Sequence, residues 1–477
     1  MSSSNGRVAM EQVEVDRLAD AANDVLLQKS GSRSSTYGGW MMIATILIEA
    51  WDLYAMSFVL VFIKSEYSPD AFQLGWLAGG VQAGALVGAI LGGWAADRLG
   101  RRRMFLITMV LFVVLAVAQA FSANAWDLII MRILIGVPLG ADIAVGYTYI
   151  MESMSRGARD RMGSRWQGMF GLGEVLSIVA VTIMYVAGID HETLWRVALG
   201  LGAIPAIVLL LMRLKMPETP TSLVHSGNFV QAKQVAKKLF DETLDMLPNH
   251  DVTVTKPKVG DFLKVIWADK TKRRASIFAW ISNACQGAEF TAFGFYIPVI
   301  LVTAGVGVGE GGNMIGTNLV TAGIFSLATI SGFLAPVMIH RTGHRGVARW
   351  GFGLAFIGLL LGALGFATNM SWIIILGAAV LMWGHYWDAS NGMTIASLVA
   401  PSRFKGTASG FGYIFVKGAS FFGAFVFPAM TAAFGHIGAT LAVSILSLVG
   451  FLAAQFILPE VYGYIEREKA QSGAVQS

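Results

Sequence analysis

Residues 92–103 read GGWAADRLGRRR. An apolar stretch of membrane-spanning length runs into this segment, and another runs out of it. One acid, Asp97, and four arginines lie between the two stretches, and Gly100 interrupts them as a helix breaker. A short, strongly basic turn between two membrane-length helices indicates which side of a bilayer the turn faces.

The composition of the chain excludes a soluble protein. Hydrophobic residues make up 55% of the 477 positions and charged residues only 14%, too few to cover a soluble surface. Cys285 is the only cysteine, so the chain can form no disulfide within itself. The net charge of +5 lies in short loops between apolar segments. It therefore indicates membrane topology, and we expect no nucleic-acid partner.

Hydropathy predicts an all-α membrane protein with twelve transmembrane helices in two six-helix bundles around a central cavity. Each apolar stretch has roughly 20 residues or slightly more, enough to cross a bilayer as a helix. The stretches lie at about 39–63, 72–97, 104–123, 127–151, 164–188, 194–214, 274–304, 314–339, 347–367, 371–399, 407–432 and 435–458.

The loops alternate between basic and nearly neutral along the chain. With twelve spans every basic loop falls on one side, and the positive-inside rule places that side and both termini in the cytoplasm. We therefore expect an integral protein of the plasma (cell inner) membrane, working as a monomer. The expected parts are a cytoplasmic tail at 1–37, a first bundle at 38–214, a cytoplasmic linker with short helices at 215–272, a second bundle at 273–458 and a cytoplasmic tail at 459–477.

The two halves resemble each other in sequence. The basic turn after the second span has a counterpart after the eighth, at residues 340–345, which read HRTGHR. His340 stands there at the position of Asp97. The turn of the first half therefore keeps the acid that could pair across the bundle interface, and the turn of the second half is a degraded copy without it. Parallel six-span repeats imply a pseudo-two-fold axis along the membrane normal and a cavity between the halves.

The chain resembles the major facilitator superfamily at several motifs. The family turn between spans two and three follows the pattern G-x-x-x-D-R-x-G-R-R, matched here by Gly93, Asp97, Arg98, Gly100, Arg101 and Arg102. The resemblance implies that this turn gates the transporter on its cytoplasmic side. Arg132, Gly136 and Gly140 resemble the run in span four, and residues 217–220, reading PETP, resemble the segment after span six of sugar-porter-like members.

The resemblance leaves the branch of the superfamily open. Residues 49–53 (EAWDL) and 140–142 (GAD) resemble motifs of aromatic-acid and phosphate proton symporters. Gln286, Tyr296 and Pro298 resemble span seven of a sugar porter, but Cys285 and Thr291 replace the second glutamine and the asparagine. These departures favour an organic acid or another anion over a sugar.

Four ionisable residues of the first half are candidates for proton coupling. Glu49 and Asp52 are three positions apart, so they share a helix face, and two close carboxylates favour holding a proton. Asp142 is expected to face the cavity opposite Asp52. Arg132 is expected either to gate and couple transport or to form a structural ion pair. The alternative for each carboxylate is a structural hydrogen bond to a neighbouring helix.

The second half carries the candidate substrate-binding residues. Their polar and aromatic side chains would wall a cavity in spans seven, ten and eleven. The residues are Gln286, Glu289, Tyr296, Trp387, Asp388, Asn391 and Lys417. Lys417 would neutralise an anionic substrate or pair with Asp388. His385 and Asp388 are not expected to bind a metal, because the sequence shows no third ligand near them.

These features predict a secondary active transporter, a proton-coupled symporter of a small polar metabolite that works by alternating access. The alternatives are a sugar or polyol porter, a proton-driven exporter of drugs or metabolites and, in a different class, a transporter-like receptor or sensor. No motif of a serine hydrolase, a P-loop enzyme or a zinc protease is present, so an enzyme is not expected. We expect no cofactor, only the proton as coupling ion, with the lipid bilayer and a small-molecule substrate as partners.

Overall fold

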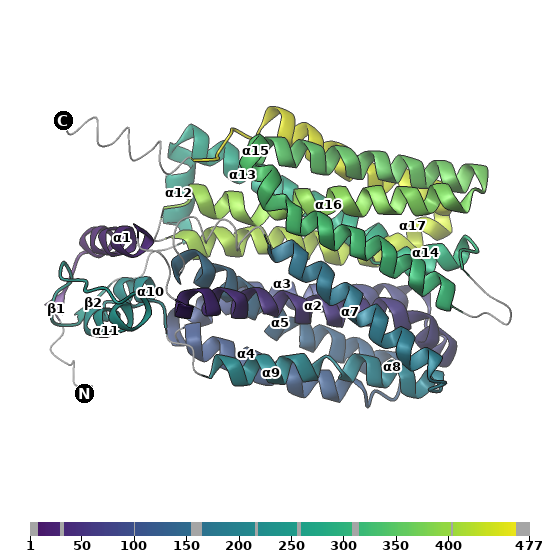
Figure 1. Ribbon diagram of the computed structural model, residues 1–477, viewed down its shortest axis with the longest axis horizontal. Coiled ribbons are helices and arrows are strands. Elements are labelled where there is room, and N and C mark those ends of the chain that lie inside the picture. Colours follow the sequence, from purple (N-terminus) through teal and green to yellow (C-terminus); the bar gives the residue numbers. More distant parts are fainter. Residues whose placement is uncertain are drawn as a thin grey trace.

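The computed structural model describes residues 8–28, 33–99, 101–153, 165–214, 218–254, 259–307, 314–401 and 404–463. Helices account for nearly all of this structure (Figure 1). In chain order the elements are β1 (Val8–Ala9), α1 (Gln12–Gln28), α2 (Arg33–Tyr67), α3 (Ala71–Leu99), α4 (Arg101–Gln119), α5 (Ala125–Ser153), α7 (Trp166–Val186), α8 (His191–Gly200), α9 (Ala203–Arg213), α10 (Pro220–His225), α11 (Phe229–Phe240), β2 (Val252–Thr253), α12 (Val259–Ala268), α13 (Lys270–Glu289), the π-helix η1 (Phe290–Gly294), α14 (Ile297–Thr303), α15 (Ile315–Thr368), α16 (Ser371–Val399) and α17 (Lys405–Phe456).

The prediction of an all-α membrane protein with twelve spans is confirmed. Eight helical segments of the described chain are long and apolar enough to cross a membrane. Two of them, α15 and α17, each hold two spans, because the chain turns at Gly343 and Gly435, whose φ angles are 73° and 67°. Glycine adopts this left-handed backbone at little cost, so a single residue reverses the chain between two membrane helices. Helices α5 and α16 supply the remaining two spans.

The helices form two bundles that lie side by side (Figure 1). Helices α2 to α9 form the lower bundle of the view, and α13 to α17 form the upper one. The bundles touch along two pairs of helices, α3 with α17 and α7 with α15. Helix α3 is the second span of the first half and meets the fifth span of the second half, in α17. Helix α7 is the fifth span of the first half and meets the second span of the second half, in α15. This exchange is the contact pattern expected from two parallel repeats.

Glycines let the second and fourth spans pack closely within the first bundle. A Cβ at Gly84 or Gly88 in α3 would collide with the backbone of α5, and one at Gly136 or Gly140 in α5 would collide with the backbone of α3. Small residues in facing positions bring two membrane helices into backbone contact. The spacing of Gly136 and Gly140 in the sequence therefore serves helix packing.

A small layer of structure lies beyond one end of the bundles (Figure 1). Helices α1, α10 and α11 pack around a core that includes Leu26, Phe229 and Val252. Strands β1 and β2 pair in parallel, with Val8 opposite Val252. The short helices expected in the linker are α10, α11 and α12. Helix α11 ends at Phe240, because Asp241 adopts the left-handed backbone (φ 57°) that closes a helix.

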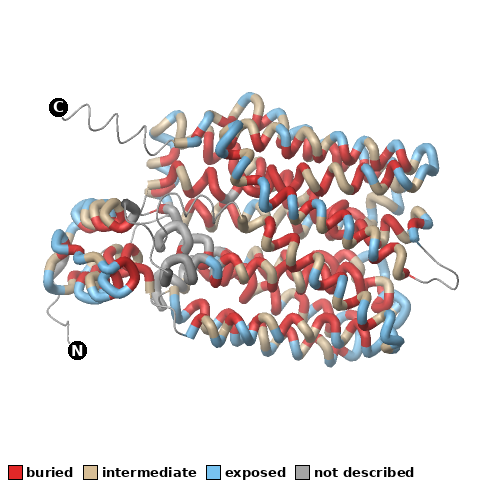
Figure 2. Tube along the Cα trace, viewed as in Figure 1, coloured by how far each residue is buried: buried red, intermediate tan, exposed pale blue. Residues whose placement is uncertain are grey.

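Large apolar side chains are exposed on the outward faces of both bundles. Val114 of α4, Ile183 of α7 and Phe422 of α17 are 58%, 62% and 63% exposed. Figure 2 shows exposed positions along the outer helices and buried positions between the bundles. An apolar surface of this extent suits contact with lipid.

Candidate functional site

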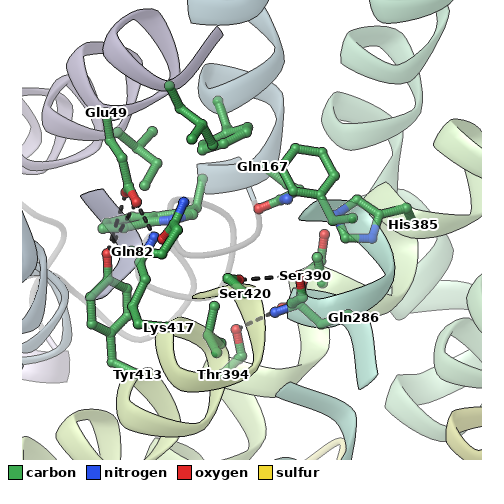
Figure 3. Close-up of a pocket in the computed structure, with 18 residues that line it drawn as sticks. Glu49, Gln82, Gln167, Gln286, His385, Ser390, Thr394, Tyr413, Lys417 and Ser420 are labelled. Atoms are coloured by element: carbon green, nitrogen blue, oxygen red, sulfur yellow. Dashed lines mark hydrogen bonds and ion pairs between the residues drawn. The ribbon is translucent and has the colours of Figure 1, made fainter. Parts of the chain in front are cut away.

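A pocket lies between the two bundles and receives side chains from both (Figure 3). The first half contributes residues of α2, α3 and α7, and the second contributes residues of α13, η1, α16 and α17. The pocket is lined by Ile46, Glu49, Leu53, Gln82, Trp166, Gln167, Phe170, Gln286, Gly287, Phe290, His385, Ala389, Ser390, Thr394, Tyr413, Val416, Lys417 and Ser420. A site shared by both halves can be exposed to either side of a membrane when the halves rock.

Three glutamines give the pocket wall both donors and acceptors. Gln82, Gln167 and Gln286 come from three different helices, and each amide can donate two hydrogen bonds and accept two. The side-chain oxygen of Gln82 is buried and has no hydrogen-bond partner within the described chain. The rings of Phe170 and Phe290, with centroids 5.6 Å apart, close one side. Neutral amides beside aromatic rings suit a solute that carries many hydroxyl groups.

An ion pair crosses the pocket from one half to the other. The ammonium group of Lys417 in α17 donates to Glu49 Oε1 in α2, and the Tyr413 hydroxyl lies 3.3 Å from Glu49 Oε2. The Lys417 nitrogen is also 5.0 Å from the centre of the Tyr413 ring. Glu49 therefore neutralises Lys417. The expectation that Lys417 pairs with Asp388 is wrong, because its partner is Glu49. The expectation that Lys417 neutralises an anionic substrate stays a prediction.

Asp52 forms a buried ion pair with Arg132 behind the pocket. Arg132 Nη1 donates to Asp52 Oδ2 at 2.7 Å, and Gln119 Nε2 donates to Asp52 Oδ1 at 3.3 Å. Nε and Nη2 of Arg132 are buried and have no hydrogen-bond partner within the described chain. Glu49 and Asp52 therefore do not share a proton between themselves, since each carboxylate faces its own cation.

Asp142 lies away from the cavity, contrary to expectation. Arg213 Nη1 at the end of α9 donates to both oxygens of Asp142, at 2.7 and 3.0 Å, and the Thr108 hydroxyl donates to Oδ1 at 2.8 Å. Arg213 also donates to the Thr45 hydroxyl and lies 4.8 Å above the ring of Phe105. This cluster joins α2, α4, α5 and α9 and does not line the pocket.

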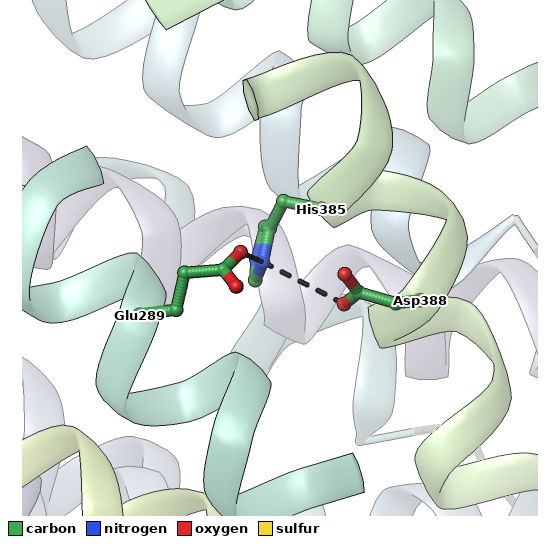
Figure 4. A group of neighbouring side chains, drawn as sticks. All are labelled: Glu289, His385 and Asp388. Carbon is green, nitrogen blue, oxygen red and sulfur yellow. Dashed lines mark ion pairs between the residues drawn. The ribbon is translucent and has the colours of Figure 1, made fainter. Parts of the chain in front are cut away.

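Glu289, His385 and Asp388 lie close together, and His385 is part of the pocket lining (Figure 4). His385 Nδ1 lies 3.6 Å from Glu289 Oε1 and 3.7 Å from Asp388 Oδ1. One ligand atom of each residue lies within 4.8 Å of the others, so the group could surround a proton or a small cation. The sequence argument against a metal at His385 and Asp388 rested on the lack of a third ligand. That premise is wrong, because Glu289 stands beside them.

The other candidate residues of the second half differ in their surroundings. Gln286 and Lys417 line the pocket. The Tyr296 hydroxyl donates to the Ala424 carbonyl at 2.9 Å, and Trp387 Nε1 donates to the Ser331 carbonyl at 3.1 Å. Asn391 Oδ1 lies 2.7 Å from His344 Nδ1. Tyr296, Trp387 and Asn391 therefore satisfy their polar groups within the second half and do not line the pocket.

Sequence reasoning missed most of the pocket's polar residues. Gln82 could have been noticed as the one polar side chain in the middle of an apolar span. Gln167 and Tyr413 offered no such signal, because both lie near basic loops where polar residues are common. Their place in the wall depends on how each helix is rotated about its own axis.

The basic turn of the first half is described only in part. Helix α3 ends at Leu99 and α4 begins at Arg101, as expected from a break at Gly100. The Arg102 backbone N–H donates to Glu218 Oε2 at 3.1 Å, and the Arg102 side chain donates to the Leu214 carbonyl at 2.8 Å. Gly100 and the side chains of Asp97 and Arg98 lie outside the described structure, so the gating role of the motif, Gly93 included, stays a prediction.

The basic turn of the second half, at residues 340–345, is held by the same kinds of hydrogen bond. The backbone N–H groups of His344 and Arg345 donate to the two carboxylate oxygens of Glu460, at 3.1 and 3.2 Å. The Arg345 side chain donates to the Gln455 carbonyl. Each turn is therefore held by a glutamate that follows the sixth span of its own half. Glu460 corresponds to Glu218 and not to Asp97, so the expectation that His340 makes the second turn a degraded copy stays a prediction.

Comparison with known proteins gives one consistent result. The sequence profile of the sugar (and other) transporter family matches residues 39–465. The chain is 25% identical to the probable metabolite transport protein CsbC of Bacillus subtilis, over 87% of this chain and 90% of that protein. It is 26% identical to the D-xylose transporter of Levilactobacillus brevis, over 82% and 85%. It is 27% identical to the arabinose-proton symporter of Escherichia coli, over 72% and 73%.

The fold is also shared with a solved transporter. The partially occluded, inward-open structure of the xylose transporter XylE from Escherichia coli aligns with a TM-score of 0.71. The alignment covers 91% of this chain and 99% of that one, at 19% sequence identity.

Proposed function

The chain belongs to the sugar (and other) transporter family of the major facilitator superfamily, and from this premise we propose that it is a proton-coupled symporter of a neutral sugar. As a member of that family it is an integral membrane transporter and not an enzyme, and it needs no cofactor. The sugar itself, the coupling to protons and the direction of transport are the parts that we propose.

The pairing of Lys417 with Glu49 is the observation that favours a sugar over an anion as the substrate. Lys417 and Glu49 cancel each other's charge, so an anionic substrate would meet no free cation at the wall. The remaining polar groups are amides, hydroxyls, the Trp166 indole and the His385 imidazole, all of which can hydrogen-bond a sugar's hydroxyl groups. Relatives named for xylose and arabinose support the same choice. We therefore favour the sugar-porter alternative over the organic acid.

Asp52 is the residue that we propose takes the coupling proton. In the proton-free state its charge is held by Arg132 at 2.7 Å. Protonation removes that charge and so weakens the ion pair, which joins α2 to α5 within the first half. Neutralisation of Asp52 then shifts the equilibrium between the two conformations of alternating access, in which the pocket is open to one side of the membrane or to the other.

We also propose a membrane arrangement that follows from the charge of the loops. Both termini and the layer of α1, α10 and α11 lie in the cytoplasm of a plasma membrane, since the basic turns lie on that side. The first bundle spans residues 38–214 and the second 273–458, with 215–272 as linker and 1–37 and 459–477 as tails. Each monomer carries a complete pocket and transports alone.

Uptake into proteoliposomes tests proton coupling. Radiolabelled xylose should accumulate when the outside is acidic, and a protonophore should abolish the accumulation. The Asp52→Asn variant should still exchange labelled for unlabelled xylose but should not accumulate it, because exchange needs no net proton movement. Xylose uptake by wild-type protein that ignores both pH and protonophore would show that the transporter is not a symporter.

The Glu49→Gln variant tests the choice of a neutral substrate. Removing the carboxylate leaves Lys417 with an uncompensated charge in the pocket. Binding of xylose should weaken, and binding of its carboxylate analogue xylonate should strengthen, as measured by thermal stabilisation of the purified protein. If wild-type protein is stabilised by organic acids and by no sugar, the pocket selects anions and the proposal is wrong.

A further inference from the structure

The cluster of Glu289, His385 and Asp388 is set against the pocket but is not part of its open surface. The three side chains are 0%, 1% and 0% exposed. His385 alone among them lines the pocket, and its ring stacks on Phe290 with centroids 4.5 Å apart. In Figure 4 the edge of the imidazole ring lies between the two carboxylates. The histidine therefore connects two buried acids to the space that holds substrate.

Several polar atoms of the cluster have no hydrogen-bond partner within the described chain. They are Oε1 of Glu289, Nδ1 of His385 and both carboxylate oxygens of Asp388. The Ser447 hydroxyl of α17 donates to the other oxygen of Glu289. Buried polar groups in proteins are normally paired, so three side chains that point unpaired atoms at one another indicate a missing ligand.

The charges of the cluster do not balance. With a neutral imidazole it carries two negative charges, and the described structure gives Glu289 and Asp388 no ion pair except with His385. Two uncompensated carboxylates at this depth cost several kcal/mol each. Two bound protons, one on the imidazole and one on a carboxyl group, make the cluster neutral.

Few other ionisable groups lie on the elements packed around the cluster. On α7, the buried Glu174 carboxylate accepts a hydrogen bond from the hydroxyl of Tyr386, the residue after His385. On α13, Cys285 lies one turn before Glu289 and is close enough to be affected by both carboxylates. On α15, the backbone at Gly351 lies against Asp388, and His344 lies two turns earlier in the chain, against Asn391. On α17, Lys417 is paired with Glu49.

The distances favour a proton as the ligand. The separations of 3.6 and 3.7 Å exceed a hydrogen bond by about half an ångström and are nearly equal. A proton on Nδ1 therefore faces both carboxylates, and a small rotation of either side chain brings it to hydrogen-bond distance.

We propose that Glu289, His385 and Asp388 form a second protonation site, separate from Asp52 and Arg132, whose occupancy is linked to substrate in the pocket through His385. The link to substrate rests on the proposed transport function, whereas proton binding does not. The two parts therefore need separate measurements.

Infrared spectroscopy of the full-length protein in lipid nanodiscs tests the site itself. A protonated buried carboxyl group gives a carbonyl band that shifts in heavy water. The wild type should show this band at neutral pH, and both Asp388→Asn and Glu289→Gln should reduce it. Asp142→Asn removes a buried carboxylate that is paired with Arg213, so it serves as the matched control and should not reduce the band. An unchanged band in both cluster variants overturns the proposal. So does a chelator-treated wild type that lacks the band but takes up one Zn²⁺ per chain, with no uptake by Asp388→Asn.

The pH dependence of xylose affinity tests the link to the pocket. If one proton of the cluster is coupled to xylose binding, it contributes about a tenfold change in xylose affinity per pH unit. A variant that cannot bind this proton should lose that contribution. Asp388→Asn should therefore flatten the pH profile, and His385→Gln should flatten it as well if the histidine is the connection. A wild-type slope in both variants overturns the link. Xylose that fails to bind the wild type at any pH overturns it too, together with the sugar assignment, while the infrared result stands alone.

Discussion

The first half holds two of its buried carboxylates against arginines of the same half, whereas the second half holds two against a single histidine. Asp52 and Asp142 each lie 2.7 Å from a guanidinium nitrogen. Within the described residues, Glu289 and Asp388 form ion pairs only with His385, at 3.6 and 3.7 Å. Protonation of an acid in the first half therefore breaks a short ion pair with an arginine, whereas the two acids of the second half share one side chain that can itself be neutral or charged.

Removing the arginine of one N-terminal pair should have the largest effect. Arg213→Met leaves Asp142 buried without its cation and also removes the contact with Phe105. We expect the free energy of unfolding to fall by about 3–5 kcal/mol, the range for breaking a buried ion pair. Thermal unfolding of the purified protein in detergent measures this loss.

The double variant Asp142→Asn with Arg213→Met is the control. It removes both charges, so it should recover much of the stability that the single variant loses. A double variant no more stable than Arg213→Met would mean that the unpaired carboxylate is not the cause of the loss.

Removing the glutamate that holds each basic turn should cost less stability, and the cost should differ between the two turns. Glu460 accepts backbone hydrogen bonds from His344, Arg345 and Tyr462, whereas Glu218 accepts one from Arg102. Glu460→Gln should therefore cost about 1 kcal/mol, and Glu218→Gln less. Hydrogen exchange at residues 343–346 and 101–104 should report these changes locally. Equal acceleration at both turns would show that the count of backbone bonds does not matter.

The smallest effect is expected at Asp388, where the comparison predicts a contrast between two identical substitutions. Asp142→Asn weakens three hydrogen bonds and leaves Arg213 buried without its counter-charge, so it should cost about 3 kcal/mol. Asp388→Asn removes no hydrogen bond of the described chain and should change stability by less than about 0.5 kcal/mol. Similar losses in the two variants would mean that Asp388 is paired after all.

Much of the fold could be predicted from the sequence, because the bilayer imposes it. The span at 371–399 coincides with α16, and the expected breaks between spans eight and nine and between eleven and twelve fall at Gly343 and Gly435. Hydropathy and loop charge are local properties of the chain, so they are visible without knowing which helices touch.

The partners of the buried charges could not be predicted in the same way. Asp142 pairs with Arg213, 71 positions along the chain, and Glu49 pairs with Lys417, 368 positions along. Such pairs depend on the rotation of each helix and on which helices are neighbours, and no spacing within one helix encodes either. Glu460 was missed for a related reason, since it lies just beyond the last span, where an acid attracts no notice.

The pairing of β1 with β2 has a consequence for how the protein is made. Val8 lies opposite Val252, so the two strands bracket the entire first half of the chain. During synthesis the strand pair cannot form until about 240 further residues have left the ribosome, a contact of very high sequence separation. The pair can therefore close only after the first six spans have been synthesised, and once closed it joins the two ends of the first half.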